Sequence, residues 1–412
     1  MLFEDISLSK TIQRGLYEKG FVEATPIQEQ VIPEVLRRND VVGCAQTGTG
    51  KTGAFAIPII NLLQKKVGTS KAPKTIQALV IVPTRELAVQ INQDFQDLSK
   101  FTNLRTAVVF GGASMHPQIE LIKKGIDILV ATPGRLMDLR KQGVVKLEEI
   151  RILVLDEADL MLEMGFFEDV RKVLKLAPNL EQRLLFSATI PPKVRELADS
   201  FLKDPIEVEI TPSASPATAI EQKLFVVGKE NKNALLLHLL KDSLKEASVL
   251  IFRKTRYGVE KSFESLTAEG YKVGELHGDK SQSARQSILN AFKSGELDLL
   301  VATDVAARGL DIQDLDVVVN FDIPGQPELY VHRIGRTGRA GKQGVSLSFC
   351  SPEEKHLLSG IQKLIGAKIP VVEEHPFKAD LNENPVVHTS RGSKHKKGRK
   401  GAGSKAKKKR WY

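Results

Sequence analysis

Short apolar runs alternate along the chain with longer stretches that carry apolar residues on one helical face. Apolar runs bounded by turn residues are typical of buried strands, and the longer amphipathic stretches are typical of helices. The alternation predicts an α/β fold, in which a mostly parallel sheet carries helices on both faces. In the first half of the chain the predicted strands are residues 41–42, 78–82, 107–110, 128–130, 152–155 and 184–186.

A second cycle of strands and helices begins near Ile220, after a connector rich in Pro and Ser. Its predicted strands are residues 224–227, 249–252, 273–276, 299–301, 317–320 and 345–349. Residues 130–132 and 301–303 both read Val-Ala-Thr, at the end of a predicted strand in each half. We therefore expect two tandem copies of one α/β unit. The predicted divisions are a first domain at 1–208, a linker at 209–219, a second domain at 220–370 and a tail at 371–412.

The net charge of +10 is concentrated in the tail. Residues 391–410 contain eleven Lys and Arg residues and no Asp or Glu. Subtracting those eleven from 60 leaves 49 cations against 50 anions in the rest of the chain. A segment of Gly, Ser, Lys and Arg lacks the apolar side chains needed to offset its ordering entropy, so we expect a disordered tail attracted to polyanions. A solubilising tail or a localisation signal would have the same composition.

Other classes of protein are disfavoured by the sequence. No stretch approaches the roughly 20 consecutive apolar residues of a membrane span, and no basic region precedes an apolar run at the N-terminus. The only cysteines, Cys44 and Cys350, lie far apart, and with scattered histidines they argue against a zinc site. We expect a cytoplasmic protein without a membrane segment.

A glycine-rich stretch at residues 45–52 lies between an apolar run and a predicted helix. Gly48 and Gly50 let the backbone curl so that its N–H groups face a phosphate at the positive end of the helix dipole. Lys51 can then reach the β- and γ-phosphates, and the Thr52 hydroxyl is placed to bind Mg²⁺. Ala45 stands where the general pattern has its first glycine. The predicted nucleotide-binding residues are Ala45, Gln46, Thr47, Gly48, Thr49, Gly50, Lys51 and Thr52.

An acidic pair, Asp156 and Glu157, follows the apolar run at residues 152–155. Ligand chemistry gathers at the carboxyl ends of the strands in such sheets. Asp156 could hold Mg²⁺, directly or through water, beside the phosphates held by Lys51 and Thr52. Glu157 could then orient and deprotonate the attacking water. A helix-capping carboxylate cluster is the alternative, but the phosphate loop upstream favours catalysis.

Two further features point to a nucleotide. Gln28 lies near the start of a predicted helix at residues 27–36, and its amide can donate to and accept from adenine. A glutamine at such a position is also common as a plain surface residue. Arg333, Arg336 and Arg339 follow at intervals of three and could project toward one γ-phosphate as arginine fingers. The alternative is a solvated basic face.

The ordered set of motifs resembles that of the DEAD-box RNA helicases over about residues 1–370. Ala24 departs from the family, which usually has proline at this position. The short connector and the basic tail resemble most the bacterial RhlE branch. The motifs that carry the resemblance are Phe3 and residues 20–28, 45–52, 83–87, 111–112, 132–135, 156–159, 187–189, 282–285, 303–311 and 332–339.

The resemblance implies a pair of RecA-like domains that close on ATP and single-stranded RNA. It implies that Gln28 reads adenine, that Phe3 stacks on it, and that Asp311 meets the ribose. Arg336 and Arg339 would reach across to the phosphates. The residues implied to contact the RNA backbone are Arg85, Gly112, Thr132, Arg135, Arg285 and Thr303, and those implied to couple the acidic centre to the domain interface are Ser187 and Thr189.

The leading hypothesis is an ATP-dependent RNA helicase that uses ATP and Mg²⁺ to separate short duplexes or remodel RNA–protein complexes. We expect a monomer acting on single-stranded and short duplex RNA, with ribosomal or RNA-degradation complexes among its targets. One alternative is a DNA helicase of the same superfamily; Asp159 at the end of the acidic centre and Gln28 favour RNA. The other is a non-catalytic RNA clamp or annealing protein, against which the intact Lys51, Glu157 and Arg336 argue.

Overall fold

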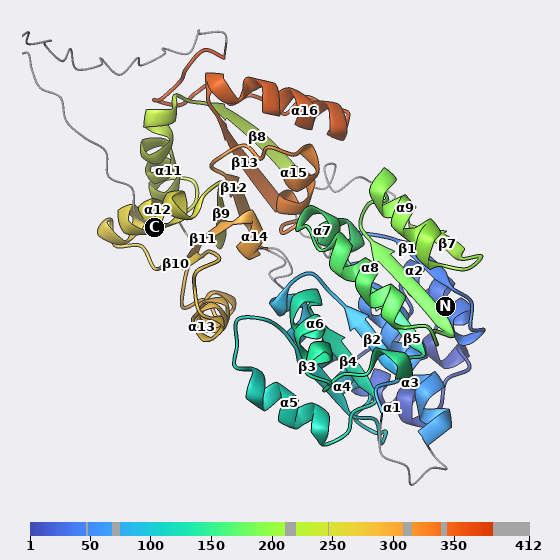
Figure 1. Cartoon of the computed structure of the whole chain (residues 1–412). Coiled ribbons are helices and arrows are strands. Elements are labelled where there is room, and N and C mark those ends of the chain that lie inside the picture. Colours follow the sequence, from blue (N-terminus) through green and yellow to red (C-terminus); the bar gives the residue numbers. More distant parts are fainter. Residues whose placement is uncertain are drawn as a thin grey trace, which may run out of the picture.

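The computed structural model describes residues 1–46, 48–67, 75–210, 220–245, 247–307, 315–338 and 344–381 (Figure 1). Two parallel sheets follow one another along the chain, each with helices on both faces. This arrangement confirms the predicted α/β fold of two tandem units. The predicted linker, apart from residues 209 and 210, and the tail beyond residue 381 lie outside the described residues. Within those residues, no helix combines the length and apolar character needed to cross a membrane.

The first sheet has the strand order β3-β4-β2-β5-β6-β1-β7, and all neighbouring pairs are parallel. Strands β2, β4 and β5 are buried at every position, as expected for a sheet that is covered on both faces. The strands are β1 Val41–Cys44, β2 Ala78–Ile81, β3 Thr106–Val109, β4 Ile128–Ala131, β5 Ile152–Leu155, β6 Gln182–Ser187 and β7 Ile206–Glu209.

Helices on the two faces of this sheet form two separate cores. Helices α1 to α4 share one core, in which Phe55 packs against Phe95 and Phe186. Helices α5 to α9 share the core on the opposite face. The helices are α1 Lys10–Glu18, α2 Pro26–Leu36, α3 Lys51–Val67, α4 Arg85–Leu98, α5 Met115–Lys123, α6 Pro133–Lys141, α7 Ala158–Glu163, α8 Phe167–Leu176 and α9 Pro192–Phe201.

The second sheet has the order β10-β11-β9-β12-β13-β8, again with parallel neighbours throughout. Its strands are β8 Ile220–Val226, β9 Val249–Arg253, β10 Val273–Leu276, β11 Leu299–Thr303, β12 Val317–Asn320 and β13 Gly344–Cys350. Its helices are α11 Lys232–Lys241, α12 Arg256–Ala268, α13 Gln282–Lys293, α14 Asp304–Ala307, α15 Pro327–Ile334 and α16 Lys355–Ile365. The repeat predicted from the two Val-Ala-Thr sequences is therefore present as two sheets.

The chain after α16 returns to the edge of the second sheet. Leu224 of β8 donates a backbone hydrogen bond to the carbonyl of Pro370 at 2.8 Å, and Val372 donates to the carbonyl of Leu224 at 2.8 Å. Val372 and Phe377 also pack against the core of this domain. The described part of the domain therefore continues to residue 381, past the predicted boundary at 370. It does so because apolar side chains of this short segment pack against the domain core at the edge of the sheet.

Candidate functional site

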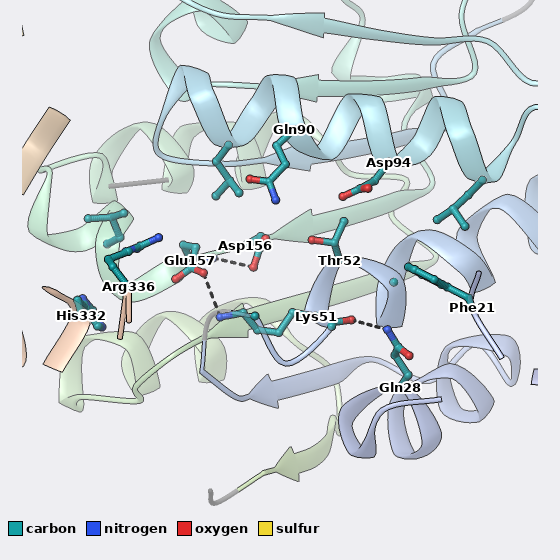
Figure 2. Close-up of a pocket in the computed structure, with 16 residues that line it drawn as sticks. Phe21, Gln28, Lys51, Thr52, Gln90, Asp94, Asp156, Glu157, His332 and Arg336 are labelled. Atoms are coloured by element: carbon teal, nitrogen blue, oxygen red, sulfur yellow. Dashed lines mark hydrogen bonds and ion pairs between the residues drawn. The ribbon is translucent and has the colours of Figure 1, made fainter. Parts of the chain in front are cut away.

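A cavity lies between the two domains (Figure 2). The first domain supplies the beginning of α3, the acidic pair after β5, and one face of α4. The second domain supplies His332 from α15 and Arg336 from the turn that follows it. Because both domains form the walls, the cavity is complete only when the domains meet.

The phosphate loop is closed around Lys51. Gly48 and Gly50 have φ angles of 88° and 93°, in a region that side-chain-bearing residues rarely adopt. Lys51 is only 4% exposed. Its ammonium donates to the Ala45 carbonyl at 2.9 Å and lies 3.0 Å from a carboxylate oxygen of Glu157. The loop thus holds a buried cation against the acidic centre, and the predicted contact of Lys51 with phosphates stays a prediction.

The three threonines of the phosphate loop differ in their contacts and in whether the structure describes them. The Thr49 hydroxyl donates to the Gln46 carbonyl at 2.7 Å, which tightens the turn. Thr47 lies outside the described residues. Thr52 is the second residue of α3 and lines the cavity, and its hydroxyl is directed toward Asp156 in Figure 2. Thr52 and Asp156 therefore face the same space.

The acidic pair is held in an unusual backbone conformation. Glu157 has φ 53° and ψ 53°, a left-handed conformation that is costly for a residue with a side chain. Its backbone N–H donates to the Asp156 carboxylate at 2.9 Å. Burial and the neighbouring Glu157 raise the pKa of Asp156 to about 7. Burial also opposes the charge of Glu157, but Lys51, His332 and Arg336 outweigh it and lower the pKa of Glu157. The lowered pKa favours the ionised form of Glu157.

Asp159 connects the acidic loop to the end of β6. Its backbone N–H donates to the Ser187 hydroxyl at 3.1 Å. Its carboxylate accepts from both the backbone N–H and the hydroxyl of Thr189, at 2.9 and 2.8 Å. Ser187 and Thr189 are thus linked to the acidic loop by direct hydrogen bonds, which is the connection a coupling role would need.

Gln28 lines the far end of the cavity and is 4% exposed. Its amide oxygen accepts from the backbone N–H of Thr25 at 3.0 Å, and its amide nitrogen donates to the Gly50 carbonyl at 3.0 Å. A primary amide has two N–H donors and two acceptor lone pairs. These two contacts fix the plane of the amide and leave one donor and one acceptor for the edge of a base.

The aromatic residue that faces the cavity is Phe21, which the sequence analysis did not select. Phe21 lines the cavity and is 36% exposed. Phe3 is 4% exposed and stacks on Phe21, with ring centroids 6.1 Å apart and an interplanar angle of 20°. Phe3 is not among the residues that line this cavity, and its contact with adenine stays a prediction. Phe3 supports the ring that a base would meet.

The three arginines that the sequence predicts as arginine fingers differ in what the structure shows of them. Arg336 lines the cavity beside Glu157 (Figure 2). Arg333 is turned inward and pairs with both carboxylate oxygens of Asp304, at 2.6 and 2.8 Å. It is therefore a structural residue of its own domain. Arg339, like Asp311, lies outside the described residues.

The predicted RNA contacts of the first domain lie at its strand ends. Arg85 is the first residue of α4, and a Cβ added at Gly112, which has φ 74°, would collide with its guanidinium. Thr132 is the residue before α6. Arg135 donates to the Ala113 carbonyl at 2.8 Å, while its Nε and Nη1 have no hydrogen-bond acceptor among the described residues. The structure thus brings Arg85 and Gly112 together and leaves donors on Arg135.

The predicted RNA contacts of the second domain are Arg285 and Thr303. Arg285 donates from Nε to a carboxylate oxygen of Glu86 in the first domain at 2.7 Å, and both side chains are under 10% exposed. Its other nitrogens donate to the carbonyls of His277 and Ala306. The structure thus gives Arg285 a buried partner across the domain interface, and its contact with RNA stays a prediction. Thr303 ends β11 and accepts from the N–H of Ala306 at 3.4 Å.

One face of α4 forms a wall of the cavity that sequence reasoning missed. Leu87, Gln90, Asp94 and Leu98 all line the cavity and recur at helical spacing. Gln90 and Asp94 are the polar members of this face and are directed into the cavity in Figure 2. A fully buried helix face would be apolar, but this face carries Gln90 and Asp94 beside Leu87 and Leu98. These two polar residues were the signal that the sequence offered for a cavity wall.

Comparison with known proteins agrees with this geometry. The DEAD/DEAH box helicase family matches residues 25–197, and the helicase conserved C-terminal domain matches residues 231–341. The first match contains strands β1 to β6 of the first sheet, and the second contains strands β9 to β12 of the second sheet. Both matched ranges include residues that line the cavity.

The chain is similar to bacterial and eukaryotic proteins over most of its length. It is 45% identical over 390 residues to the ATP-dependent RNA helicase RhlB of Histophilus somni, covering 94% of this chain and 92% of the relative. It is 41% identical over 392 residues to the DEAD-box ATP-dependent RNA helicase RhpA of Helicobacter pylori, covering 95% and 77%. The structure of S. cerevisiae Dbp5 bound to RNA and ADP BeF3 is 31% identical, covers 90% of this chain and 95% of its own, and has a TM-score of 0.79.

The narrower assignment to the RhlE branch stays a prediction, since the relatives above carry other names. Identity and coverage of this extent, together with the phosphate loop, the acidic pair and the arginine that share one cavity, establish the family. The chain belongs to the DEAD-box family of ATP-dependent RNA helicases.

Proposed function

We propose that this chain hydrolyses ATP in the interdomain cavity when RNA brings its two domains together, and that the cycle locally separates short RNA duplexes or remodels RNA–protein complexes. The RNA-helicase activity is that of its family. The observation that carries the proposal is that Lys51 and Glu157 from the first domain and Arg336 from the second line one cavity. Hydrolysis would then depend on the position of the second domain.

Each wall of the cavity has a separate role in this proposal. Lys51 binds the β- and γ-phosphates, and its ion pair with Glu157 positions the carboxylate near the γ-phosphate. Glu157 accepts a proton from the attacking water. Arg336 stabilises the charge that develops on the transferred phosphoryl group. We retain Arg339 as a second phosphate contact and Asp311 as a ribose contact, as the family resemblance implies.

The cavity is suited to Mg²⁺ bound between Thr52, Asp156 and the phosphates, partly through water. Burial, and after it the neighbouring Glu157, raises the pKa of Asp156. A divalent cation beside this carboxylate would favour its ionised form. Within the described residues no group of three or more His, Cys, Asp or Glu is arranged to hold a metal. A site completed by phosphate oxygens and water needs no such group. When bound, Mg²⁺ would neutralise charge on the β- and γ-phosphates.

At the other end of the cavity, adenine would lie against Phe21, with its edge toward Gln28. Phe21 offers an exposed ring backed by Phe3, and Gln28 has one donor and one acceptor remaining. Adenine presents a donor and an acceptor side by side. We therefore assign base stacking to Phe21 and base reading to Gln28.

RNA would bind across the ends of the strands, through its backbone. Arg85, Gly112, Thr132 and Arg135 of the first domain and Thr303 of the second are the proposed contacts. Arginine, hydroxyl and backbone donors of this kind hold phosphates and carry no sequence information directly. Arg285 and Glu86 would hold the domains together beside the RNA.

A monomer is the proposed acting form, because one chain supplies the residues that line the cavity. Its proposed location is the cytoplasm. Single-stranded RNA and short duplexes, including those in ribosomal or RNA-degradation complexes, are the proposed substrates. A non-catalytic clamp remains the alternative function. The buried, ion-paired Lys51 and the strained Glu157 argue against it, because a clamp without turnover would have no use for them.

The nucleotide preference tests both the cavity and the reading role of Gln28. The wild-type protein should hydrolyse ATP faster with single-stranded RNA, whereas GTP should be hydrolysed far more slowly. Guanine presents an acceptor where adenine presents its amino group, and each unsatisfied polar group costs roughly 1–3 kcal/mol, or about 5- to 150-fold. The measurement is the specificity constant for each nucleotide with RNA present. Comparable values would remove Gln28 from its role, and a lack of stimulation by RNA would contradict the proposed function.

A further inference from the structure

An ion-pair clasp joins the segment before Phe21 to α4. The ammonium of Lys19 lies 2.7 Å from Asp94 and 3.2 Å from Asp97, with 22% of the Lys19 side chain exposed. Burial disfavours the charge of Lys19, but hydrogen bonds and charge from Asp94 and Asp97 outweigh it and raise the pKa of Lys19. Partial burial and two acidic partners make this contact stronger than an ordinary surface pair. The clasp is defined as Lys19, Asp94 and Asp97.

On one side, the clasp fixes the ring that faces the base. Lys19 is followed by Gly20, with φ 72°, and then by Phe21. Phe21 donates its backbone N–H to the Leu16 carbonyl at 2.9 Å, so the turn after α1 is tight. The ammonium of Lys19 also lies 6.0 Å from the centre of the Phe21 ring. A displacement of Lys19 would therefore change the position of the Phe21 ring.

On the other side, the clasp holds a helix whose far end carries Arg85, a proposed RNA contact, and meets the second domain through Glu86. Asp94 lines the cavity together with Phe21. It lies on α4, a helix of 14 residues, which at about 1.5 Å per residue spans about 20 Å. The first turn of α4 carries Arg85, beside Gly112, and Glu86, which pairs with Arg285 across the interface. One rigid element thus runs from the base end of the cavity to the RNA end.

We propose that the clasp couples nucleotide binding to RNA binding: by tying Phe21 to α4, Lys19 makes an ordered base favour the position of α4 that presents Arg85 and Glu86. Lys19 is a positioning residue, because it acts through Phe21 and Asp94. The inference rests on the proposed function, since it assumes that the base lies against Phe21 and that RNA meets Arg85. Coupling of this kind is reciprocal, so the nucleotide must strengthen RNA binding by the same factor as RNA strengthens nucleotide binding.

The chain offers a matched control for the clasp. Glu18, the neighbour of Lys19, forms an ion pair with Lys100 at 2.7 Å. This pair also joins the end of α1 to the chain just after α4, but Lys100 is 61% exposed and neither residue lines the cavity. A substitution at Lys100 removes a contact of the same type close to the clasp without removing a contact of Phe21 or Asp94.

The experiment compares the wild-type protein with Lys19→Met, Lys19→Arg and Lys100→Met. Methionine keeps most of the apolar stem of Lys19 and removes its charge, whereas arginine keeps the charge. The dissociation constant of a non-hydrolysable ATP analogue is measured with and without single-stranded RNA, and that of RNA with and without the analogue. The ratio of the two constants is the coupling factor, and agreement between the two routes checks the cycle.

Lys19→Met should lower the coupling factor by about fivefold or more, against couplings of roughly 5- to 150-fold in allosteric proteins. Lys19→Arg should restore most of it, and Lys100→Met should equal the wild type. An unchanged coupling factor in Lys19→Met would overturn the clasp, as would an equal loss in Lys100→Met, which would show a general loosening of the two helices. A wild-type protein without coupling would overturn the proposed function together with the clasp, which distinguishes the two failures.

Discussion

Arg336→Ala should lower RNA-stimulated ATP hydrolysis by roughly 10³- to 10⁵-fold, the range measured for arginine fingers. Arg336 comes from the second domain but lines the cavity beside Glu157 of the first. Its charge acts on the phosphoryl group only when the domains meet, so ATP binding without RNA should be nearly unchanged. The measurement is the turnover number at saturating ATP and RNA, together with the dissociation constant of the ATP analogue in the absence of RNA.

Two further variants serve as comparisons for Arg336→Ala. Arg336→Lys keeps the charge but loses the planar fork of donors, so it should recover only part of the rate. Lys241→Ala removes one cation from the same domain at an exposed pair with Glu269, away from the cavity, and should hydrolyse ATP like the wild type. If Arg336→Ala turns over ATP at the normal rate with RNA present, catalysis does not depend on the meeting of the two domains.

Glu157→Gln should lower ATP turnover by about 10²- to 10⁴-fold, as expected for the loss of a general base. Glutamine matches glutamate in size, so the strained backbone at this position faces no new steric demand. Loss of the ion pair with Lys51 leaves that ammonium to the phosphates, and ATP and RNA should still bind. Turnover at saturating substrates and equilibrium binding of both ligands are the measurements.

Lys51→Ala is the comparison that separates binding from chemistry. It removes the cation that reaches the phosphates and should weaken ATP binding by about tenfold or more, because a hydrogen bond to a charged group is worth roughly 1.5–3 kcal/mol. Equal losses of ATP affinity in Lys51→Ala and Glu157→Gln would show that Glu157 is a binding residue and not the general base.

The strands could be predicted from the sequence because most of them are buried on both faces and appear as continuous apolar runs. Strand β7 could not, because Val208 is the only one of its four residues that is buried. An edge strand with one inward side chain has no run to detect. The segment after residue 370 was assigned to the tail for a related reason, since only the pair Val371 and Val372 and single residues such as Phe377 are apolar in a mostly polar stretch.

The site could be predicted where its residues are close in sequence, as in the phosphate loop and the acidic pair. It could not be predicted where a partner comes from elsewhere in the chain. Arg333 looked unpaired in its own segment, but Asp304, which neutralises it, is 29 residues away. Arg285 meets Glu86 at a separation of 199 residues. The first contact depends on how the second domain folds, and the second depends on how the two domains meet. Neither is contained in a local pattern.

The choice between Phe3 and Phe21 was limited in the same way. Both aromatic residues precede Gln28, and both belong to the motifs that carry the family resemblance. Which ring faces the cavity is decided by the turn after α1, where Gly20 with φ 72° directs Phe21 outward over Phe3. The order in which two rings stack cannot be obtained from their positions in the sequence.

We propose that ATP and RNA together assemble one catalytic cavity from two domains, and that this cycle separates strands. A strand-separation assay with a short RNA duplex that carries a single-stranded overhang tests this proposal. The wild-type protein should release the shorter strand with ATP, and should release far less with GTP, with Arg336→Ala, or from a DNA duplex of the same sequence. Equal strand release with and without ATP would contradict this mechanism.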